Sequence, residues 1–298
     1  MQTNGGFIIF PGDDCPAPIE EAGGKGYSLI RLSGAGLPVP PGCVLTTAFF
    51  EPWYASLRET DAWRTLKASE PPVPGSCARA LEAYCSTLVL SPVQRETLDQ
   101  ALRRLDPVPR LWAVRSSSPA EDLGDASFAG LYRTEIGVPR AGLEDAIRRV
   151  FASCFDEKVL SYRPETRRDS RMPQMAVIVQ AMVAADVSGI AFSANPANNC
   201  REEVVINAGW GLGETIVSGH MSPDELVLAK SGTTILARKT GAKETALFLH
   251  PEEGIRECHG FRSDQFCLED RDAYLLRDLV RRVEELYGRP VDIEWALR

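Results

Sequence analysis

The sequence predicts an α+β protein of two parts, in which a helical region precedes a region dominated by strands. Its 298 residues suffice for two domains of ordinary size or for one large domain with two lobes. Residues 44–105 show helical periodicity in pieces, whereas from residue 174 onward short apolar runs bounded by turn residues are typical of strands. We divide the chain into a first lobe at 1–190 and a second lobe at 191–298.

The first lobe is expected to begin with a helix over 24–36, which follows a glycine-rich turn and ends at Gly36. The Pro-Val-Pro-Pro-Gly run at 38–42 then forms an extended connection, because a residue that precedes proline disfavours the helical conformation. Strands at 110–118 and 132–138 and an amphipathic helix over 143–155 complete this lobe.

The rest of the chain is expected to form strands and one long helix. That helix, over 272–288, carries apolar residues on one face and ends at Gly288, with Pro290 behind it. The last segment, 290–297, alternates apolar and polar residues and predicts a strand. Further strands are expected at 174–183, 188–194, 203–209, 225–230 and 234–239.

Composition and cysteine spacing exclude several classes of protein. The net charge of −8 and the pI near 5.1 argue against binding of nucleic acid over a broad surface. No C-x-x-C pair occurs among the eight cysteines, which excludes zinc ribbons and thioredoxin-type motifs and leaves residues such as Cys154 as small core residues. The sequence shows no signal peptide and no run of about 18 apolar residues. We expect a cytoplasmic protein that binds neither nucleic acid nor membranes.

A lysine among three glycines, in the stretch GGKG at 23–26, is the first candidate for chemistry. Glycines allow tight turns and positive φ, and the lysine is a point charge for a phosphate. A Walker A loop is excluded, because position 19 is isoleucine and Gly26 stands where serine or threonine should follow Lys25. On this stretch alone, a solvated lysine in a glycine turn remains the alternative.

The stretch AVRSSSPAEDLGDASFAG, residues 113–130, combines three features that suit an anion. Ser118 and Glu121 match a capping box with proline at the first helical position, and a helix N-terminus is itself an anion site. Arg115, at the end of a strand, is placed to form a fork onto a phosphate. The small, glycine-bounded loop at 124–130 suits a cover that excludes water from a ligand.

A glycine-rich stretch of the second lobe carries a weaker signal. Gly209, Gly211 and Gly213 alternate after a strand and precede Glu214. This spacing fails the dinucleotide fingerprint G-x-G-x-x-G at its last glycine.

A serine–histidine hydrolase is also poorly supported, because the sequence has no G-x-S-x-G and its three histidines stand in no suggestive context.

The segment VDIEW, at 291–295, offers two carboxylates to one face of a strand. Residues two apart in a strand share a face, so Asp292 and Glu294 point the same way. Two carboxylates on one face collect a hard cation such as Mg²⁺ beside a phosphate chain. A strand with one solvated face is the alternative.

Taken together, these stretches resemble one family. GGKGYSLIRL, AVRSSSPAEDLGDASFAGLYRT, VIVQAMVAADVSGIAFSANP, VINAGWGLGETIVSGHMSPDE and VDIEWAL occur in the order found in the N-terminal ATP-binding domain of the phosphoenolpyruvate synthase, pyruvate phosphate dikinase and rifampin phosphotransferase group. The resemblance covers nearly the whole chain. It implies an ATP-grasp fold, two mixed α/β lobes with a nucleotide cleft between them.

The resemblance also implies a chemistry and a set of residues. ATP would be split to AMP and phosphate, and the β-phosphoryl would pass to a histidine on a separate swivelling domain. Lys25 and Arg115 would hold phosphates and act in catalysis. By the same resemblance, Gly130 and Thr134 would belong to the loop over the phosphates, Gln180 would face the nucleotide, Glu214 would lie in the nucleotide site and Glu294 would hold Mg²⁺, with Lys239 and Lys243 as weaker candidates for the pocket.

Two departures from the family pattern bear on the function. The chain stops at Arg298, before a strand that ends in a Gln-Ala-Arg-Pro motif, and the Thr-His-Gly-Gly run of the phosphohistidine is absent. We therefore expect an excised domain of a longer enzyme in preference to a subunit that needs a partner. A non-catalytic nucleotide-binding module and an ATP-grasp ligase remain alternatives. The acceptor (pyruvate, a phenol, water or an antibiotic hydroxyl) stays open.

Overall fold

The computed structural model shows two compact units, Met1–Met182 and Val183–Arg298. The expected lobe boundary at residue 190 lies inside strand β6 (Val187–Phe192), all of whose ladder partners belong to the second unit. Helices and strands occur in both units, which confirms the mixed α/β class. The structure describes residues 7–13, 17–69, 73–105, 110–120, 131–161, 173–219, 221–250 and 254–298.

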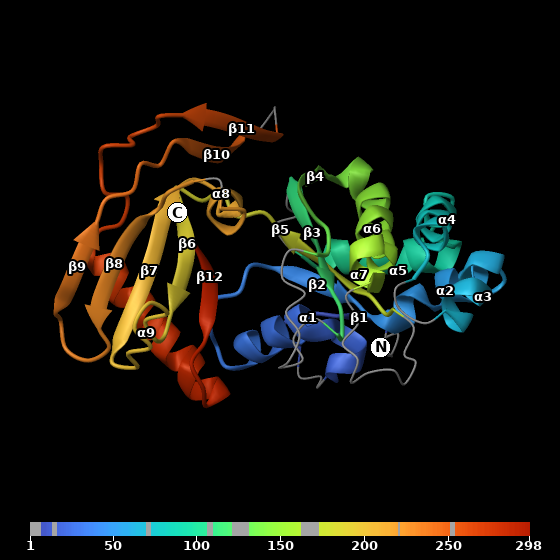
Figure 1. The fold of residues 1–298 in the computed structure, drawn as a ribbon, viewed down its shortest axis with the longest axis horizontal. Helices are drawn as coiled ribbons and strands as arrows, with labels where there is room; N and C mark the ends of the chain where they lie inside the picture. Colours follow the sequence, from blue (N-terminus) through green and yellow to red (C-terminus); the bar gives the residue numbers. More distant parts are fainter. Residues whose placement is uncertain are drawn as a thin grey trace. The chain divides into compact units, whose positions relative to one another are not determined.

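The first unit is built on a five-stranded antiparallel sheet (Figure 1). The three strands expected near residues 110, 132 and 174 are present, with slightly different bounds. Two short strands at the other edge, one of two residues and one of four, were not predicted, because so few residues show no periodicity. The order is β1 (Ile8–Ile9), β2 (Gly42–Leu45), β5 (Ala176–Ala181), β3 (Leu111–Ser117) and β4 (Thr134–Pro139).

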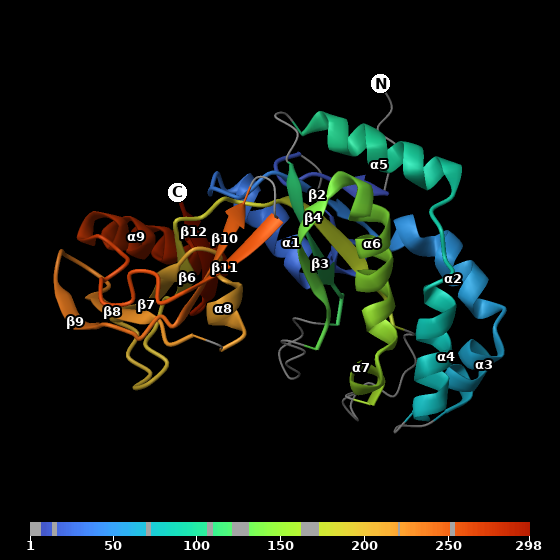
Figure 2. The ribbon, with the colours of Figure 1, turned by 90° about the horizontal axis from the view of Figure 1, so that it is seen from above.

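Helices cover both faces of this sheet. Along β5, Val177 and Val179 point into the core that contains α6 (Leu143–Ala152), while Ala176 and Ile178 pack with apolar residues of α1 (Ile19–Gly34). Figure 2 shows α1 and α6 on opposite sides of β3. The sheet is therefore buried on both faces, which explains why β5 reads as a continuous apolar run.

The helical pieces expected over 44–105 are confirmed. They pack an aromatic cluster in which the Phe50 and Phe151 rings lie 5.0 Å apart, as do those of Trp53 and Phe151. Burial among these helices raises the pKa of the Cys43 and Cys85 thiols to about 12, so these thiols stay protonated and inert. The helices are α2 (Glu51–Arg58), α3 (Asp61–Ala68), α4 (Gly75–Cys85) and α5 (Pro92–Arg104), with the short α7 (Glu157–Ser161) after α6.

The second unit is a five-stranded antiparallel sheet with one long helix on one face (Figure 1). The helix, α9 (Asp270–Tyr287), buries its apolar stripe against the sheet and ends at Gly288, whose φ of 67° forms the left-handed cap. These elements match the predicted helix and strands. The sheet order is β12 (Asp292–Leu297), β6, β7 (Glu203–Trp210), β8 (Asp224–Ala229) and β9 (Ile235–Lys239).

A separate hairpin of the second unit was not predicted. It pairs β10 (Thr245–His250) with β11 (Gly254–His259), whose side chains are mostly half-buried or exposed on both faces. Such a pair shows only weak alternation in sequence. Across the described residues, no helix combines the length and apolar character that a membrane span requires.

Candidate functional site

The glycine turn of the first unit interrupts helix α1. Gly23 has φ 70° and ψ 171°, so the chain bends there before the helix resumes through Lys25. A short helical segment that begins at Ile19 therefore precedes the turn, and the expected helix follows the turn and ends at Gly34, before the predicted end at Gly36. A Cβ on Gly23 would lie 2.0 Å from the carbonyl oxygen of Ser117, a distance that no side chain tolerates. Glycine is required here both by the positive φ and by the close approach of β3.

Hydrogen bonds fix this turn to the end of β3. The Gly24 amide donates to the Ser118 carbonyl at 3.2 Å, and the Gly26 amide donates to Ser117 Oγ at 2.8 Å. Ser117 Oγ in turn donates to the Ala22 carbonyl at 2.7 Å. The two stretches that the sequence offered for phosphate binding, GGKG and RSSS, are therefore in direct contact. The amides of Gly24 and Gly26 are engaged by protein, so these glycines serve close packing between α1 and β3.

Strand register places Arg115 beside a second predicted residue. Arg115 pairs with Thr134 across the β3–β4 ladder, and paired residues of an antiparallel ladder project to the same face. That face is the one covered by α1, because Trp112 and Val114, which alternate with Arg115, point into the core on the α6 side. Helix α1, which carries Lys25, thus covers the face of the sheet on which Arg115 and Thr134 lie.

Gln180 lies on the same face of the sheet, two residues beyond Ile178, the β5 partner of Arg115. Its side chain is buried, and its amide nitrogen donates to the Pro40 carbonyl at 3.1 Å. The proline-rich connection therefore holds this amide in place. Gly130 and the rest of the loop at 124–130 lie outside the described residues, as does Glu121 of the expected capping box; Ser118 Oγ accepts a bond from the Ala120 amide at 3.2 Å.

In the second unit, Asp292 and Glu294 lie on the exposed face of β12, as predicted. Pairing runs from Glu294 through Ile190 of β6 to Asn207 of β7 and then to Glu225 of β8, so these four share one row on the face opposite α9. Asn207 is half-buried, and its side-chain amide forms no hydrogen bond with any of the described residues. Sequence analysis missed Asn207, because its place in this row depends on the register of the paired strands.

Glu214 is the first residue of the four-residue helix α8 (Glu214–Val217), and its side chain is exposed. The glycines before it pack the chain closely. A Cβ on Gly211, at φ 76°, would lie 2.1 Å from the Leu247 carbonyl of the hairpin, and the Leu212 amide donates to that carbonyl at 2.7 Å. As in α1, the glycine pattern reflects contact between backbones.

The two weaker lysine candidates differ from each other. Lys239 is exposed on edge strand β9. Lys243 is 1% exposed, and its ammonium forms an ion pair with Asp224 and donates to the Gly241 carbonyl at 3.0 Å. The same aspartate accepts from the amides of Gly241 at 2.8 Å and Cys267 at 2.7 Å. Lys243 is therefore held by protein groups, which argues against the expected role in a phosphate pocket.

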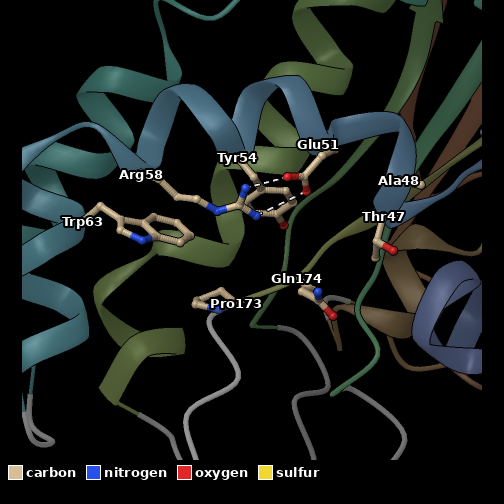
Figure 3. A pocket seen from close by; sticks show the side chains of 8 residues that line it. All are labelled: Thr47, Ala48, Glu51, Tyr54, Arg58, Trp63, Pro173 and Gln174. Atoms are coloured by element: carbon tan, nitrogen blue, oxygen red, sulfur yellow. Dashed lines mark hydrogen bonds and ion pairs between the residues drawn. The ribbon is translucent and has the colours of Figure 1, made fainter.

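The first unit also has a surface pocket of about 200 Å³ beside helix α2 (Figure 3). Its cation, Arg58, is bound by both carboxylate oxygens of Glu51, and each side chain is about half exposed. A guanidinium satisfied in this way offers little to an anion. None of the predicted site residues lines the pocket, whose walls are Thr47, Ala48, Glu51, Tyr54, Arg58, Trp63, Pro173 and Gln174.

The carboxylates of β12 suit a magnesium ion that accompanies a nucleotide. Within the described residues, no three His, Cys, Asp or Glu side chains gather as a closed metal site. Mg²⁺ beside phosphates uses one or two carboxylates and completes its shell with phosphate oxygens and water. Exposed carboxylates at Asp292 and Glu294, on one face, fit that requirement.

Comparison with known proteins identifies the family. Residues 19–298 match the family described as pyruvate phosphate dikinase, AMP/ATP-binding domain, and the chain belongs to it. A phosphoenolpyruvate synthase from Aeropyrum pernix is 32% identical over 92% of this chain, and a rifampicin phosphotransferase from Streptomyces sviceus is 37% identical over 92% of it. YvkC of Bacillus subtilis, an uncharacterized phosphotransferase, is 34% identical over 93% of the chain. The resemblance noted from the motifs is confirmed.

The match covers only part of each relative. It spans 38% of the Aeropyrum synthase and 32% of both the Streptomyces and the Bacillus protein. The chain thus spans about a third of the length of these relatives. The activities in the names of these relatives therefore belong to proteins about three times as long as this chain.

Proposed function

We propose that this chain is the ATP-binding domain of a dikinase-type phosphotransferase. In this proposal it has an ATP-grasp fold in which both lobes contribute residues to one nucleotide, and ATP is split to AMP and phosphate. The β-phosphoryl passes to a histidine on a separate domain or subunit. The observation that supports this most directly is the junction of the Lys25 turn with β3, which carries Arg115, because two cations from distant stretches are fixed on one framework.

Cations of this kind suit a phosphate chain. Arginine presents a planar fork that matches two phosphate oxygens, and lysine presents a compact charge. In a phosphoryl transfer the transition-state charge lies on the phosphoryl oxygens, so fixed cations stabilise it more than the ground state. Lys25 and Arg115 would hold these oxygens, while Thr134 and Gly130 would contribute from the loop beside them.

Gln180 would contact the nucleotide from β5, held by its bond to Pro40. On the second unit, Glu294 would hold Mg²⁺ from β12, the strand that also carries Asp292, and Glu214 would contribute to the nucleotide site from α8. A metal held there would supply positive charge that neutralises the phosphate oxygens. The chain's own part is to present the two carboxylates on an exposed face of the sheet.

The final acceptor is proposed as a small molecule. The relatives include proteins named phosphoenolpyruvate synthase and rifampicin phosphotransferase, so pyruvate or an alcohol or antibiotic hydroxyl is the class of acceptor. An ATP-binding domain does not decide among them, because acceptor contacts lie with the histidine domain and beyond.

Calorimetric titration of ATP, with and without Mg²⁺, tests the proposal. We expect Mg²⁺-dependent binding that Lys25→Ala or Arg115→Ala weakens by about 10- to 100-fold, the range for a lost hydrogen bond to a charged group. Lys67→Ala and Arg103→Ala are matched controls, because both side chains are exposed on helices α3 and α5. Undiminished affinity in both site variants would contradict the site, and failure of the unsubstituted chain to bind ATP would contradict the proposed function.

A further inference from the structure

Ser117 forms the closest link between the two phosphate stretches. It is fully buried at the end of β3, two residues after Arg115 and on the same face. Its hydroxyl donates to the Ala22 carbonyl at 2.7 Å and accepts from the Gly26 amide at 2.8 Å. In an unbroken helix these two backbone groups, four residues apart, would bond to each other. The hydroxyl therefore replaces the helical hydrogen bond that the kink at Gly23 opens.

Lys25 lies in sequence between two residues that bond to the end of β3. Its neighbours in sequence, Gly24 and Gly26, both donate to the end of β3, at Ser118 O and Ser117 Oγ. Strand β3 is an inner strand, bonded on one side to β5 and on the other to β4, so it is a rigid reference for whatever is attached to it. The backbone of Lys25 is thereby held relative to the strand from which Arg115 projects.

We propose that Ser117 is a positioning residue that sets Lys25 against Arg115 for binding of a nucleotide polyphosphate. This inference rests on the proposed function, in which both cations bind phosphate. Serine suits the role because one hydroxyl donates and accepts at once. A hydroxyl that only stabilised the fold would change the amount of folded protein, and it would not change how much Lys25 contributes to affinity.

A double-mutant cycle separates these two roles. The affinity of ATP with Mg²⁺ is measured by calorimetry for the unsubstituted chain, Ser117→Ala, Lys25→Ala and the double variant, well below the unfolding temperature of each. Ser117→Ala should weaken binding about three- to tenfold, the range for one ordinary hydrogen bond. In the Lys25→Ala background the same substitution should have little further effect, because the residue it positions is gone.

Ser116→Ala is the matched control. Ser116 is the adjacent residue, also fully buried, but it lies on the other face of β3, and its hydroxyl has no partner among the described residues. Its removal should leave ATP affinity unchanged. If Ser117→Ala does not fold, Ser117→Cys keeps the shape and weakens both bonds, and it should give a smaller loss with the same dependence on Lys25.

The outcomes are distinguishable. Equal loss from Ser117→Ala in both backgrounds, or no loss in the Lys25-containing protein, overturns the positioning role and leaves the proposed function standing. If Lys25→Ala and Arg115→Ala themselves leave ATP affinity intact, the phosphate site fails, and the role of Ser117 fails with it. If Ser117→Ala weakens ATP binding only in the protein that retains Lys25, the result supports both the positioning role of Ser117 and the phosphate site.

Discussion

Two glycine–lysine segments, GGKG at 23–26 in the first unit and TGAK at 240–243 in the second, differ in how deeply the lysine is buried. In both, the glycine lies against backbone: a Cβ would come 2.0 Å from Ser117 O at Gly23 and 2.2 Å from Pro223 O at Gly241. The two lysines differ in their burial. Lys25 is half-buried beside the end of β3, whereas Lys243 is buried and paired with Asp224.

The difference shows what a Gly–Lys pattern does and does not predict. The glycine reports close backbone contact, which both segments have. The function of the lysine depends on whether a buried carboxylate already satisfies it, and Asp224 precedes Lys243 by 19 residues with two further amides on its oxygens. A charge that is already paired cannot serve a phosphate without first breaking that pair.

The largest effect is expected from Lys243→Ala. It leaves the fully buried Asp224 carboxylate without its cation, and removal of one partner of a buried pair costs about 3–5 kcal/mol. Urea unfolding, with hydrogen exchange of the β7 and β8 amides to localise the change, measures it. The ATP affinity of the folded fraction should not change. A stable variant with weakened ATP binding would break the comparison by placing Lys243 at the nucleotide.

A smaller loss is expected from Gly23→Ala. The alanine would have to adopt φ near 70° and would place its Cβ against the Ser117 carbonyl, so we expect at least about 2 kcal/mol of destabilisation of the first unit. Gly34→Ala, in the same helix, is the control: no atom lies within 4 Å of its Cβ position. That variant should be neutral or more stable by up to about 1 kcal/mol. Equal thermal unfolding of the two variants would show that the turn is not constrained.

Periodicity predicted most of the fold, because long amphipathic helices and alternating strands carry their own signal. Helix α9 and strand β12 are examples, each with an apolar stripe set by its own sequence. The short strand β2 and the hairpin β10–β11 carry no such signal, since one is four residues long and the other has few buried side chains. Pairing with distant strands, rather than local pattern, makes them strands.

The same limit applies to the site. Lys25 and Arg115 were proposed from their local stretches, but the Ser117 hydroxyl that joins the two stretches was not, because Ser117 and Gly26 are 91 residues apart. Asn207 was assigned only to a strand, since the row from Glu294 through Ile190 exists only after the strands are paired in register. Spacing along one strand predicts which of its residues share a face of the sheet. Which residues of other strands lie beside them depends on long-range strand pairing.

A more modest effect is expected from Asn207→Ala in the second unit. If the polyphosphate and its metal lie over the row that contains Glu294, the half-buried amide contacts them, and its loss should weaken ATP binding with Mg²⁺ about three- to tenfold. Calorimetry measures the change. Glu225→Gln, one strand further from Glu294, should have a smaller effect. If Asn207→Ala binds ATP as tightly as the unsubstituted chain, Asn207 does not contact the nucleotide, and the contacts from this row of the second unit are limited to β12.

The smallest effect contrasts the buried Lys243–Asp224 pair with an ion pair at the surface of the first unit. Hydrogen bonds from Arg149 to Glu135, at 2.7 and 2.6 Å, hold the pKa of Glu135 below its ordinary value, and Arg133 adds to the shift. Because the folded pKa is the lower one, this pair stabilises the protein above the ordinary glutamate pKa of about 4.5, and the stabilisation is lost as the pH falls through the folded value.

Glu135→Gln should therefore lower the free energy of unfolding near pH 7 by about 0.2–1 kcal/mol, as for other solvent-screened pairs. The difference from the unsubstituted protein should shrink toward zero as the pH falls through the lowered pKa of Glu135 in the folded state, because below it the carboxylate is protonated in both states. Urea unfolding of both proteins across this range measures it. A difference that does not depend on pH would mean that Glu135 acts through packing on α6, and a loss as large as that of Lys243→Ala would remove the distinction between buried and exposed pairs.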